Sequence, residues 1–287
     1  MVADLTISLT KKRYNLHEFY KGSNQWEYNE LDLSPNLFTE LPIEQLCPFF
    51  NVYLLDLSHN KIMNLKNAFK KLRCLKRLKI LNLSSNLIIS PLKASDFDED
   101  SELTISLEYM SFRYNNIPSI ESRLFFRKNG SSMFPNLSFL DLSFNNLKNL
   151  DLMWPLSLPH PSLKVMISYN KIRTFTNDLK ISFNSSNLIA MTSKRIVDVK
   201  FNLINRFDDS NLLQYGLKKP YDLEKFLNQI QNYNFNYNKF ICVCPPDIGL
   251  YTVFWYSQLY SSETNVSRFS CTNIPYRNAF NFSCPVR

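Results

Sequence analysis

Four cysteines near the C-terminus are the residues of this chain best suited to chemistry. Cys242 and Cys244 form a Cys-x-Cys pair, and Cys271 and Cys284 follow later. Four thiols can bind a zinc ion, but the 13-residue step between the last two is longer than zinc sites favour. Four cysteines can instead form disulfides, which require an oxidising compartment. Four cysteines allow three connectivities, and the residues alone leave the choice open.

Other reactive groups are sparse. The three histidines, His17, His59 and His160, have no metal-ligand partner at a useful spacing. Only four glycines occur, and none belongs to a phosphate-binding loop, a nucleotide-binding fingerprint or a metalloprotease motif. The sequence predicts a protein that is not an enzyme and uses no metal or cofactor.

The organisation of the chain comes from a phrase that occurs eight times. Each copy has two apolar residues one position apart, then two residues, an asparagine, one residue and another apolar residue. The asparagines are Asn36, Asn60, Asn86, Asn115, Asn145, Asn170, Asn202 and Asn238. They lie 24, 26, 29, 30, 25, 32 and 36 residues apart, and self-similarity at such a period is typical of a solenoid.

The phrase predicts a short strand followed by a turn. Alternate residues of a strand point to one face, so the two apolar residues of each copy enter the core. Strands of successive copies then pair as a parallel sheet. The asparagine amide has two donors and an acceptor, and we expect it to satisfy backbone groups of its own turn and of the next repeat.

This pattern resembles the leucine-rich repeat family over residues 28–240. The resemblance implies an α/β solenoid, a horseshoe with a concave parallel β-sheet and an irregular or helical convex side. Apolar spacing predicts convex helices within 67–78 and 220–230. We expect three parts: an N-terminal segment at 1–27 that is an incomplete cap or repeat, eight repeats at 28–240, and a cysteine-rich cap at 241–287.

The C-terminal cysteines and Trp255 resemble the disulfide-stapled cap of extracellular leucine-rich repeat proteins. The resemblance implies two disulfides, Cys242–Cys271 and Cys244–Cys284. Such a cap would cover the apolar end and the free strand edge of the last repeat. Two residues depart from the usual sequence pattern of the family, because Lys239 stands where proline is common and Val243 where aspartate is common.

Two further cysteines, Cys47 and Cys74, precede the strands of adjacent repeats. They lie 13 and 12 residues before Asn60 and Asn86. Neighbouring repeats bring such positions close together, so a third disulfide and two free thiols are both open.

We expect a ligand on the concave face of the sheet, to which the strand residues between the core positions point. From the fourth repeat on, the position before each asparagine is aromatic: Tyr114, Phe144, Tyr169, Phe201 and Tyr237. Tyr109 and Phe139, six residues before their asparagines, join them on the same face. A large exposed aromatic patch is typical of a binding surface. An aromatic residue before the asparagine is also common in the family. These residues are therefore either a ligand-binding surface or an ordinary feature of the repeat.

The net charge of +8 is partly concentrated in one basic run: Lys66, Lys70, Lys71, Arg73, Lys76, Arg77 and Lys79. An acidic segment at 96–102 follows one repeat later. The run is either a solvated convex helix partly neutralised by that segment or a patch for heparan-type glycans, acidic lipids or nucleic acid. No aromatic residues alternate with the basic ones, which favours the first interpretation.

Six N-glycosylation sequons are present, at Asn82, Asn129, Asn136, Asn184, Asn265 and Asn281. A chain so rich in asparagine, serine and threonine contains several by chance. The sequons therefore carry little weight for location.

These observations predict an extracellular recognition module. Residues 1–10 lack the basic and apolar regions of a signal peptide, and no stretch reaches the ~20 apolar residues of a membrane span. We expect a trimmed portion of a Toll-like-receptor-like ectodomain that binds a protein or other macromolecule, with receptor dimerisation as an open question. The alternatives are a secreted adhesion or matrix protein and an intracellular repeat scaffold.

Overall fold

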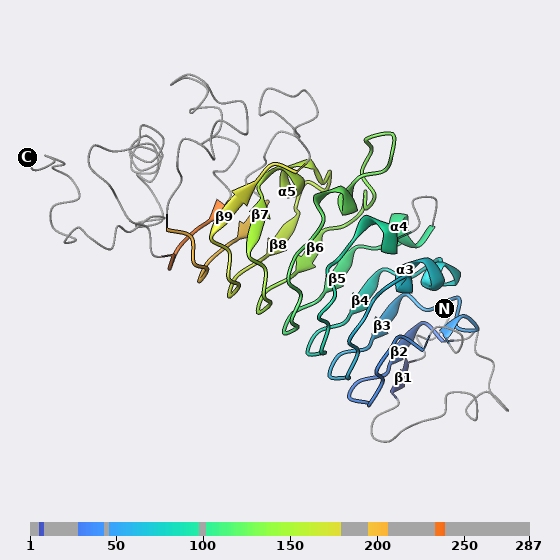
Figure 1. Cartoon of the computed structure of the whole chain (residues 1–287). Helices are drawn as coiled ribbons and strands as arrows, with labels where there is room; N and C mark the ends of the chain where they lie inside the picture. The colour runs from blue at the N-terminus through green and yellow to red at the C-terminus, as the bar shows by residue number, and fades with distance from the viewer. Residues whose placement is uncertain are drawn as a thin grey trace, which may run out of the picture.

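The computed structural model describes residues 6–8, 28–42, 46–97, 102–178, 195–205 and 233–238 of the 287-residue chain. The four C-terminal cysteines, Trp255, the sequons at 184, 265 and 281 and the helix expected within 220–230 lie outside these residues. Figure 1 shows the described part as a curved row of strands, with short helices on one side of it.

A parallel sheet of nine strands joins the described repeats. Its strands are β1 (Thr6–Ser8), β2 (Glu30–Asp32), β3 (Leu54–Asp56), β4 (Ile80–Asn82), β5 (Tyr109–Ser111), β6 (Phe139–Asp141), β8 (Lys164–Met166), β10 (Ile196–Asp198) and β11 (Tyr233–Asn234). Pairing joins equivalent positions, as Leu31 pairs with Leu55 and Leu55 with Leu81. The first two apolar residues of each phrase are buried, including Leu55 and Leu57. The predicted solenoid with a parallel sheet is confirmed.

The sheet extends to residues that the repeat pattern did not reveal. β1 pairs with β2, so Ile7 lies beside Leu31. In sequence, the position five residues after Ile7 is Lys12, whereas the position five residues after Leu31 is Asn36. The asparagine signal is therefore missing from this copy, and the strand escaped the pattern.

The other side of the sheet carries short elements. They are α3 (Ala68–Lys71), η2 (Leu72–Cys74), η3 (Ala94–Asp96), α4 (Glu102–Ser106), η4 (Ser122–Phe125), α5 (Met153–Ser157) and a second parallel pair, β7 (Asn149–Asp151) with β9 (Thr174–Thr176). The helix expected within 67–78 is shorter than predicted, because α3 passes directly into η2. Its apolar face is nevertheless buried, at Phe69, Leu72, Leu75 and Leu78.

The asparagines form a buried ladder that connects each repeat to the one before it. The Asn145 amide nitrogen donates to the carbonyls of Leu142 in its own turn, at 3.1 Å, and of Phe112 in the preceding repeat, at 2.9 Å. Its side-chain oxygen accepts the backbone N–H of Ile117 at 3.0 Å. Asn60, Asn86, Asn115, Asn170 and Asn202 repeat these contacts. We predicted that each asparagine would bond to the next repeat. That was wrong, because the hydrogen bonds go to the preceding repeat.

Large side chains fill the core under the short helices. The rings of Phe69 and Phe97 stack at 4.0 Å, and those of Phe125 and Trp154 at 4.2 Å. The buried Arg195 guanidinium donates to the carbonyls of Pro155 and Leu158, both at 2.8 Å, at the C-terminal end of α5. Burial lowers the pKa of Arg195 from its ordinary value.

Cys47 and Cys74 form a disulfide, with their Cα atoms 5.3 Å apart. It connects the segment before β3 to the end of η2, which precedes β4. Of the two possibilities for these cysteines, the structure has the disulfide and not two free thiols.

Candidate ligand-binding surface

The residue before each asparagine lies in the turn beyond the strand. Phe144, for example, comes three residues after the end of β6. Its backbone is left-handed, with φ at 56°, and φ at the other aromatic positions lies between 53° and 61°. His59 and Ser85 share this conformation in the N-terminal repeats. The turn imposes it whatever the side chain, at a cost of order 1–3 kcal/mol. The sequence predicted these aromatic residues on the sheet. They lie instead in the turns past the strand ends.

The five side chains at this position form a continuous stack, which we call the aromatic ladder: Tyr114, Phe144, Tyr169, Phe201 and Tyr237. Successive ring centroids are 4.3, 4.3, 4.4 and 4.3 Å apart. The first pair is splayed by 30°, and the others lie within 12° of parallel. The spacing follows from the sheet, because strands about 4.8 Å apart place one ring per repeat at stacking distance.

Four of the five ladder side chains are exposed, and Phe144 is half-buried. Tyr114, Tyr169, Phe201 and Tyr237 expose 48, 44, 37 and 68% of their surface. Each inner ring has its faces covered by its neighbours in the stack. The surface open to a partner therefore consists of ring edges, with tyrosine hydroxyls on three of the five residues.

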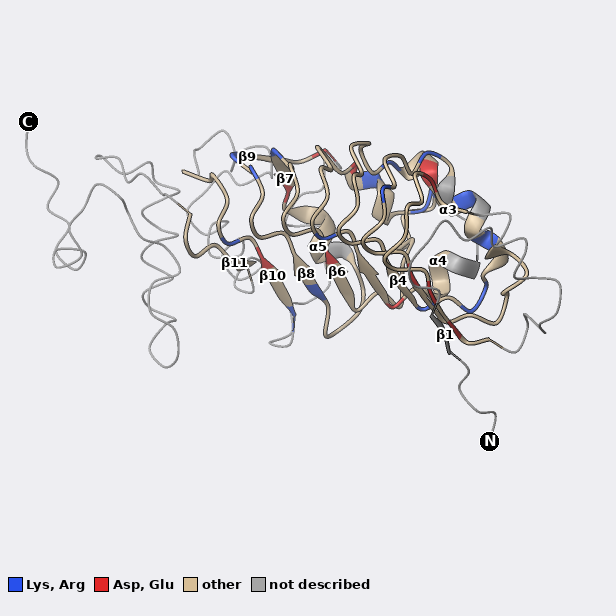
Figure 2. Cartoon of the chain, turned by 90° about the horizontal axis from the view of Figure 1, so that it is seen from below, with Lys and Arg blue, Asp and Glu red and all other residues tan. Residues whose placement is uncertain are grey.

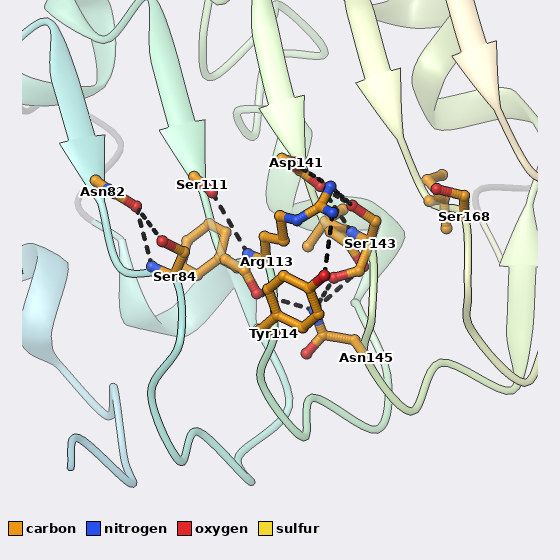
Figure 3. A network of polar contacts seen from close by, with 12 residues as sticks. Asn82, Ser84, Ser111, Arg113, Tyr114, Asp141, Ser143, Asn145 and Ser168 are labelled. Carbon is orange, nitrogen blue, oxygen red and sulfur yellow. Dashed lines mark hydrogen bonds and ion pairs between the residues drawn. The ribbon is translucent and has the colours of Figure 1, made fainter. Parts of the chain in front are cut away.

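Arg113 holds the N-terminal end of the ladder (Figure 3). Its guanidinium carbon lies 4.7 Å from the Tyr114 ring centroid and 4.6 Å from that of Phe144. The same group donates to the Tyr114 hydroxyl and the Ser143 hydroxyl, both at 3.3 Å, and lies 3.7 Å from the Asp141 carboxylate. The side chain is 38% exposed. It is thus fixed in place yet accessible.

Tyr109 and Phe139 form a second aromatic pair at the start of β5 and β6. Their rings are parallel within 2° and their centroids are 4.7 Å apart. Burial, and then the Asp141 carboxylate, raise the pKa of the Tyr109 hydroxyl above its ordinary value, so it keeps its proton in neutral solution. The pair and the ladder flank the polar row of Asp141 and Arg113.

The N-terminal repeats carry no comparable surface. Pro35, His59 and Ser85 occupy the ladder position there. Asp56 accepts the backbone N–H of Ser58 at 2.8 Å and the Asn82 amide at 3.0 Å. Asp32 and Asp198 accept the backbone N–H two residues later in the same way, so these aspartates belong to the structure of the repeat.

The basic run lies on the helical side, over α3 and the segment that follows it (Figure 2). Lys66, Lys70, Arg73 and Arg77 are exposed, and Lys79 pairs with Glu108 at 2.7 Å. Within the described ranges, no three potential metal ligands come together and no helix is long and apolar enough to cross a bilayer.

The ladder makes a prediction about stability that needs no ligand. Phe144→Ala should lower the free energy of unfolding by about 1–2 kcal/mol, because two ring stacks are lost. Phe144→Asn loses the same stacks but tolerates the left-handed backbone better than alanine does. We expect the asparagine variant to be more stable than the alanine variant by about 0.5–1 kcal/mol in urea titrations. An alanine variant as stable as the asparagine variant would contradict the left-handed backbone conformation at Phe144.

Comparison with known proteins gives partial matches. No family model matches the chain. A 121-residue stretch is 33% identical to human Leucine-rich repeats and immunoglobulin-like domains protein 3, covering 42% of this chain and 10% of that protein. A 202-residue stretch is 30% identical to Chaoptin of Drosophila melanogaster, covering 56% of this chain and 14% of that protein. The chain thus spans only about a tenth to a seventh of the length of these curated relatives.

Among solved structures, a TLR13–ssRNA13 complex superposes with a TM-score of 0.50 and 21% identity, covering 79% of this chain and 29% of that one. This likeness concerns the fold. The chain has a leucine-rich repeat fold, with distant sequence similarity to the first two proteins over part of its length.

The sequence identified the seven aromatic residues but not their arrangement. It did not reveal the role of Arg113, which occupies a position filled by serine in five other repeats: Ser34, Ser58, Ser84, Ser143 and Ser168. That departure from the repeat was the available signal. Whether the seven aromatics bind a ligand stays a prediction.

Proposed function

We propose that this chain is an extracellular recognition module that binds a protein through the aromatic ladder, Arg113 and the Tyr109–Phe139 pair. The observation that carries the proposal is the stack of five rings, four of them exposed, in the turns that follow the strands of the sheet. Aromatic and arginine side chains dominate the energetics of protein interfaces. Side chains that are already ordered lose little entropy on binding, which favours affinity.

The orientation of the rings favours a protein over a single-stranded nucleic acid. Proteins that bind single strands offer ring faces on which bases stack. In the ladder the inner faces are occupied by neighbouring rings at 4.3–4.4 Å. The exposed edges and hydroxyls suit apolar side chains and backbone carbonyls of a protein. The RNA in the TLR13 complex therefore does not direct the choice of ligand here.

The Cys47–Cys74 disulfide supports a location outside the cytosol, because disulfides persist in oxidising compartments. We further propose the cap disulfides Cys242–Cys271 and Cys244–Cys284, and a place for the chain in a Toll-like receptor ectodomain. Non-reducing peptide mapping of protein from a secretory host tests the cap. Free thiols at these four positions would contradict it.

A binding experiment with ring-deleting variants tests the ladder. The chain is screened against an array of extracellular proteins, and the affinity of each partner is then measured by surface plasmon resonance. Phe144→Asn and Tyr169→Asn should each weaken binding about 5- to 150-fold, since loss of an interface anchor costs about 1–3 kcal/mol. Ile89→Asn is the matched control, because Ile89 is 56% exposed and lies outside the ladder.

Two results would overturn the assignment. Affinity unchanged in both ring variants but lost in Lys70→Ser/Arg73→Ser would move the site to the basic helical side. Ring-dependent binding of a single-stranded RNA oligonucleotide, with no protein partner, would replace the protein ligand by a nucleic acid.

A further inference from the structure

We infer that Asn129 is the N-glycan acceptor among the described sequons, and that Asn82 and Asn136 stay unmodified. The inference rests on the secretory route of the proposed function. The three sequons are equivalent in sequence, as each has an asparagine followed two residues later by serine. The contacts of their side-chain amides separate them.

Asn129 lies at the tip of a small hairpin in the segment between η4 and β6. Phe126 and Ser132 form an antiparallel bridge at its base, and the backbone N–H of Arg127 donates to the Ser131 carbonyl at 2.9 Å. The Asn129 side-chain oxygen accepts the backbone N–H and the hydroxyl of Ser131, at 2.9 and 2.7 Å. Its amide nitrogen donates to none of the described residues, and the residue is exposed. The nitrogen that a glycan needs is therefore available.

The surroundings of the hairpin tip leave room for a large substituent. Gly130 has φ at 82°, and a β-carbon added there would meet no atom within 4 Å. The loop that connects η4 to β6 extends on the side of the short helices, away from the turns that follow the strands (Figure 1). A glycan on it would project from the solenoid.

The other two amides are engaged in the fold. Asn136 is exposed like Asn129, but its amide nitrogen donates to the Ile105 carbonyl at 2.8 Å. The Asn82 amide nitrogen donates to Asp56 at 3.0 Å across two strands of the sheet. Asn82 lies on β4 between β3 and β5, so a glycan there would lie over the neighbouring strands. Both positions favour the unmodified asparagine.

The reaction needs one co-substrate, an oligosaccharide carried on a lipid pyrophosphate. The amide nitrogen of Asn129 forms a bond to the anomeric carbon of the first sugar. The bond between that carbon and the phosphate oxygen breaks, the lipid pyrophosphate leaves with the electron pair, and the amide gives up one proton. No oxidation or reduction takes place.

The position of the glycan has a consequence for recognition. A sugar on the helical side leaves the aromatic ladder uncovered, so Asn129→Gln should change the affinity of a ladder-bound partner by less than about twofold. A glycan at Asn82 would instead cover the face of the sheet beside Asp56.

Site-specific mass spectrometry of intact glycopeptides tests the inference. The chain is expressed behind a secretion signal in mammalian cells, and the occupancy of each sequon is measured. We expect sugar on the Asn129 peptide and none on the Asn82 and Asn136 peptides. Asn129→Gln and Ser131→Ala should each remove one glycan from the intact mass, whereas the matched control Asn136→Gln should leave the mass of sugar unchanged.

An unmodified Asn129 peptide, or sugar on Asn82 or Asn136, would overturn the inference. Because the secretion signal forces the chain through the secretory route, these results leave the proposed extracellular location untouched. That location fails separately, if the protein from its native source carries free thiols at Cys47 and Cys74.

Discussion

Replacing both Cys47 and Cys74 by alanine is expected to lower the free energy of unfolding by about 3.5 kcal/mol, since the bridge closes a sequence separation of 27 residues and restricts the unfolded chain. The loss should also be local in origin. The bridge connects the segments that lead into β3 and β4, so the N-terminal repeats should lose protection first. Each repeat contacts only its neighbours, and a weakened end can unfold ahead of the rest.

Denaturant titration of the oxidised wild type and the double variant, with and without dithiothreitol, measures this effect. Reductant should destabilise the wild type toward the level of the variant. The C-terminal cysteines provide the comparison, because the double variant retains them. If reductant lowers the stability of the double variant as much as that of the wild type, the stabilisation comes from those four cysteines, and the prediction for Cys47–Cys74 is contradicted.

Most of the sheet could be predicted because its cause is local and repeated. The spacing of Leu55, Leu57 and Asn60 specifies strand, core and turn within six residues, and the copies fix the register. β1 was missed because Lys12 stands at the asparagine position of that copy. β7 and β9 were missed because they lie between asparagine phrases and pair with each other on the helical side, where the spacing of the repeats varies.

The candidate site was harder to predict because its arrangement depends on contacts between repeats. The sequence places Tyr114 and Phe144 at equivalent positions, but not in a left-handed turn where their rings stack. The role of Arg113 depends on its distance to Asp141 and to two rings, which no spacing along the chain encodes. The asparagine bonds to the preceding repeat have the same origin, since they depend on the stagger between turns.

Asn145→Ala is expected to destabilise the chain by about 3 kcal/mol, and Asn146→Ala by no more than about 0.5 kcal/mol. Asn145 is buried, and its loss leaves the Ile117 N–H without its partner inside the solenoid. The Phe112 carbonyl loses one of two donors and keeps the Asn115 amide. The unpaired N–H costs about 1–3 kcal/mol, and the lost hydrogen bonds of the Asn145 amide add to it. The Asn146 amide donates to the side chain of Asn116 at 2.7 Å near the surface, where water can replace it.

A third variant, Asn145→Asp, separates loss of the amide donors from loss of packing. An ionised carboxylate would face the carbonyls that now accept from the amide, and burial would raise its pKa above the unfolded value. The unfolded state then binds fewer protons than the native state, so the stability of this variant should rise as pH falls from 7 toward 5, relative to the wild type. Urea titrations of all three variants across this range measure both effects. Two results would contradict the role of the buried asparagines in connecting the repeats. One is an equal loss of stability in Asn145→Ala and Asn146→Ala, and the other is an Asn145→Asp variant whose stability does not rise in acid.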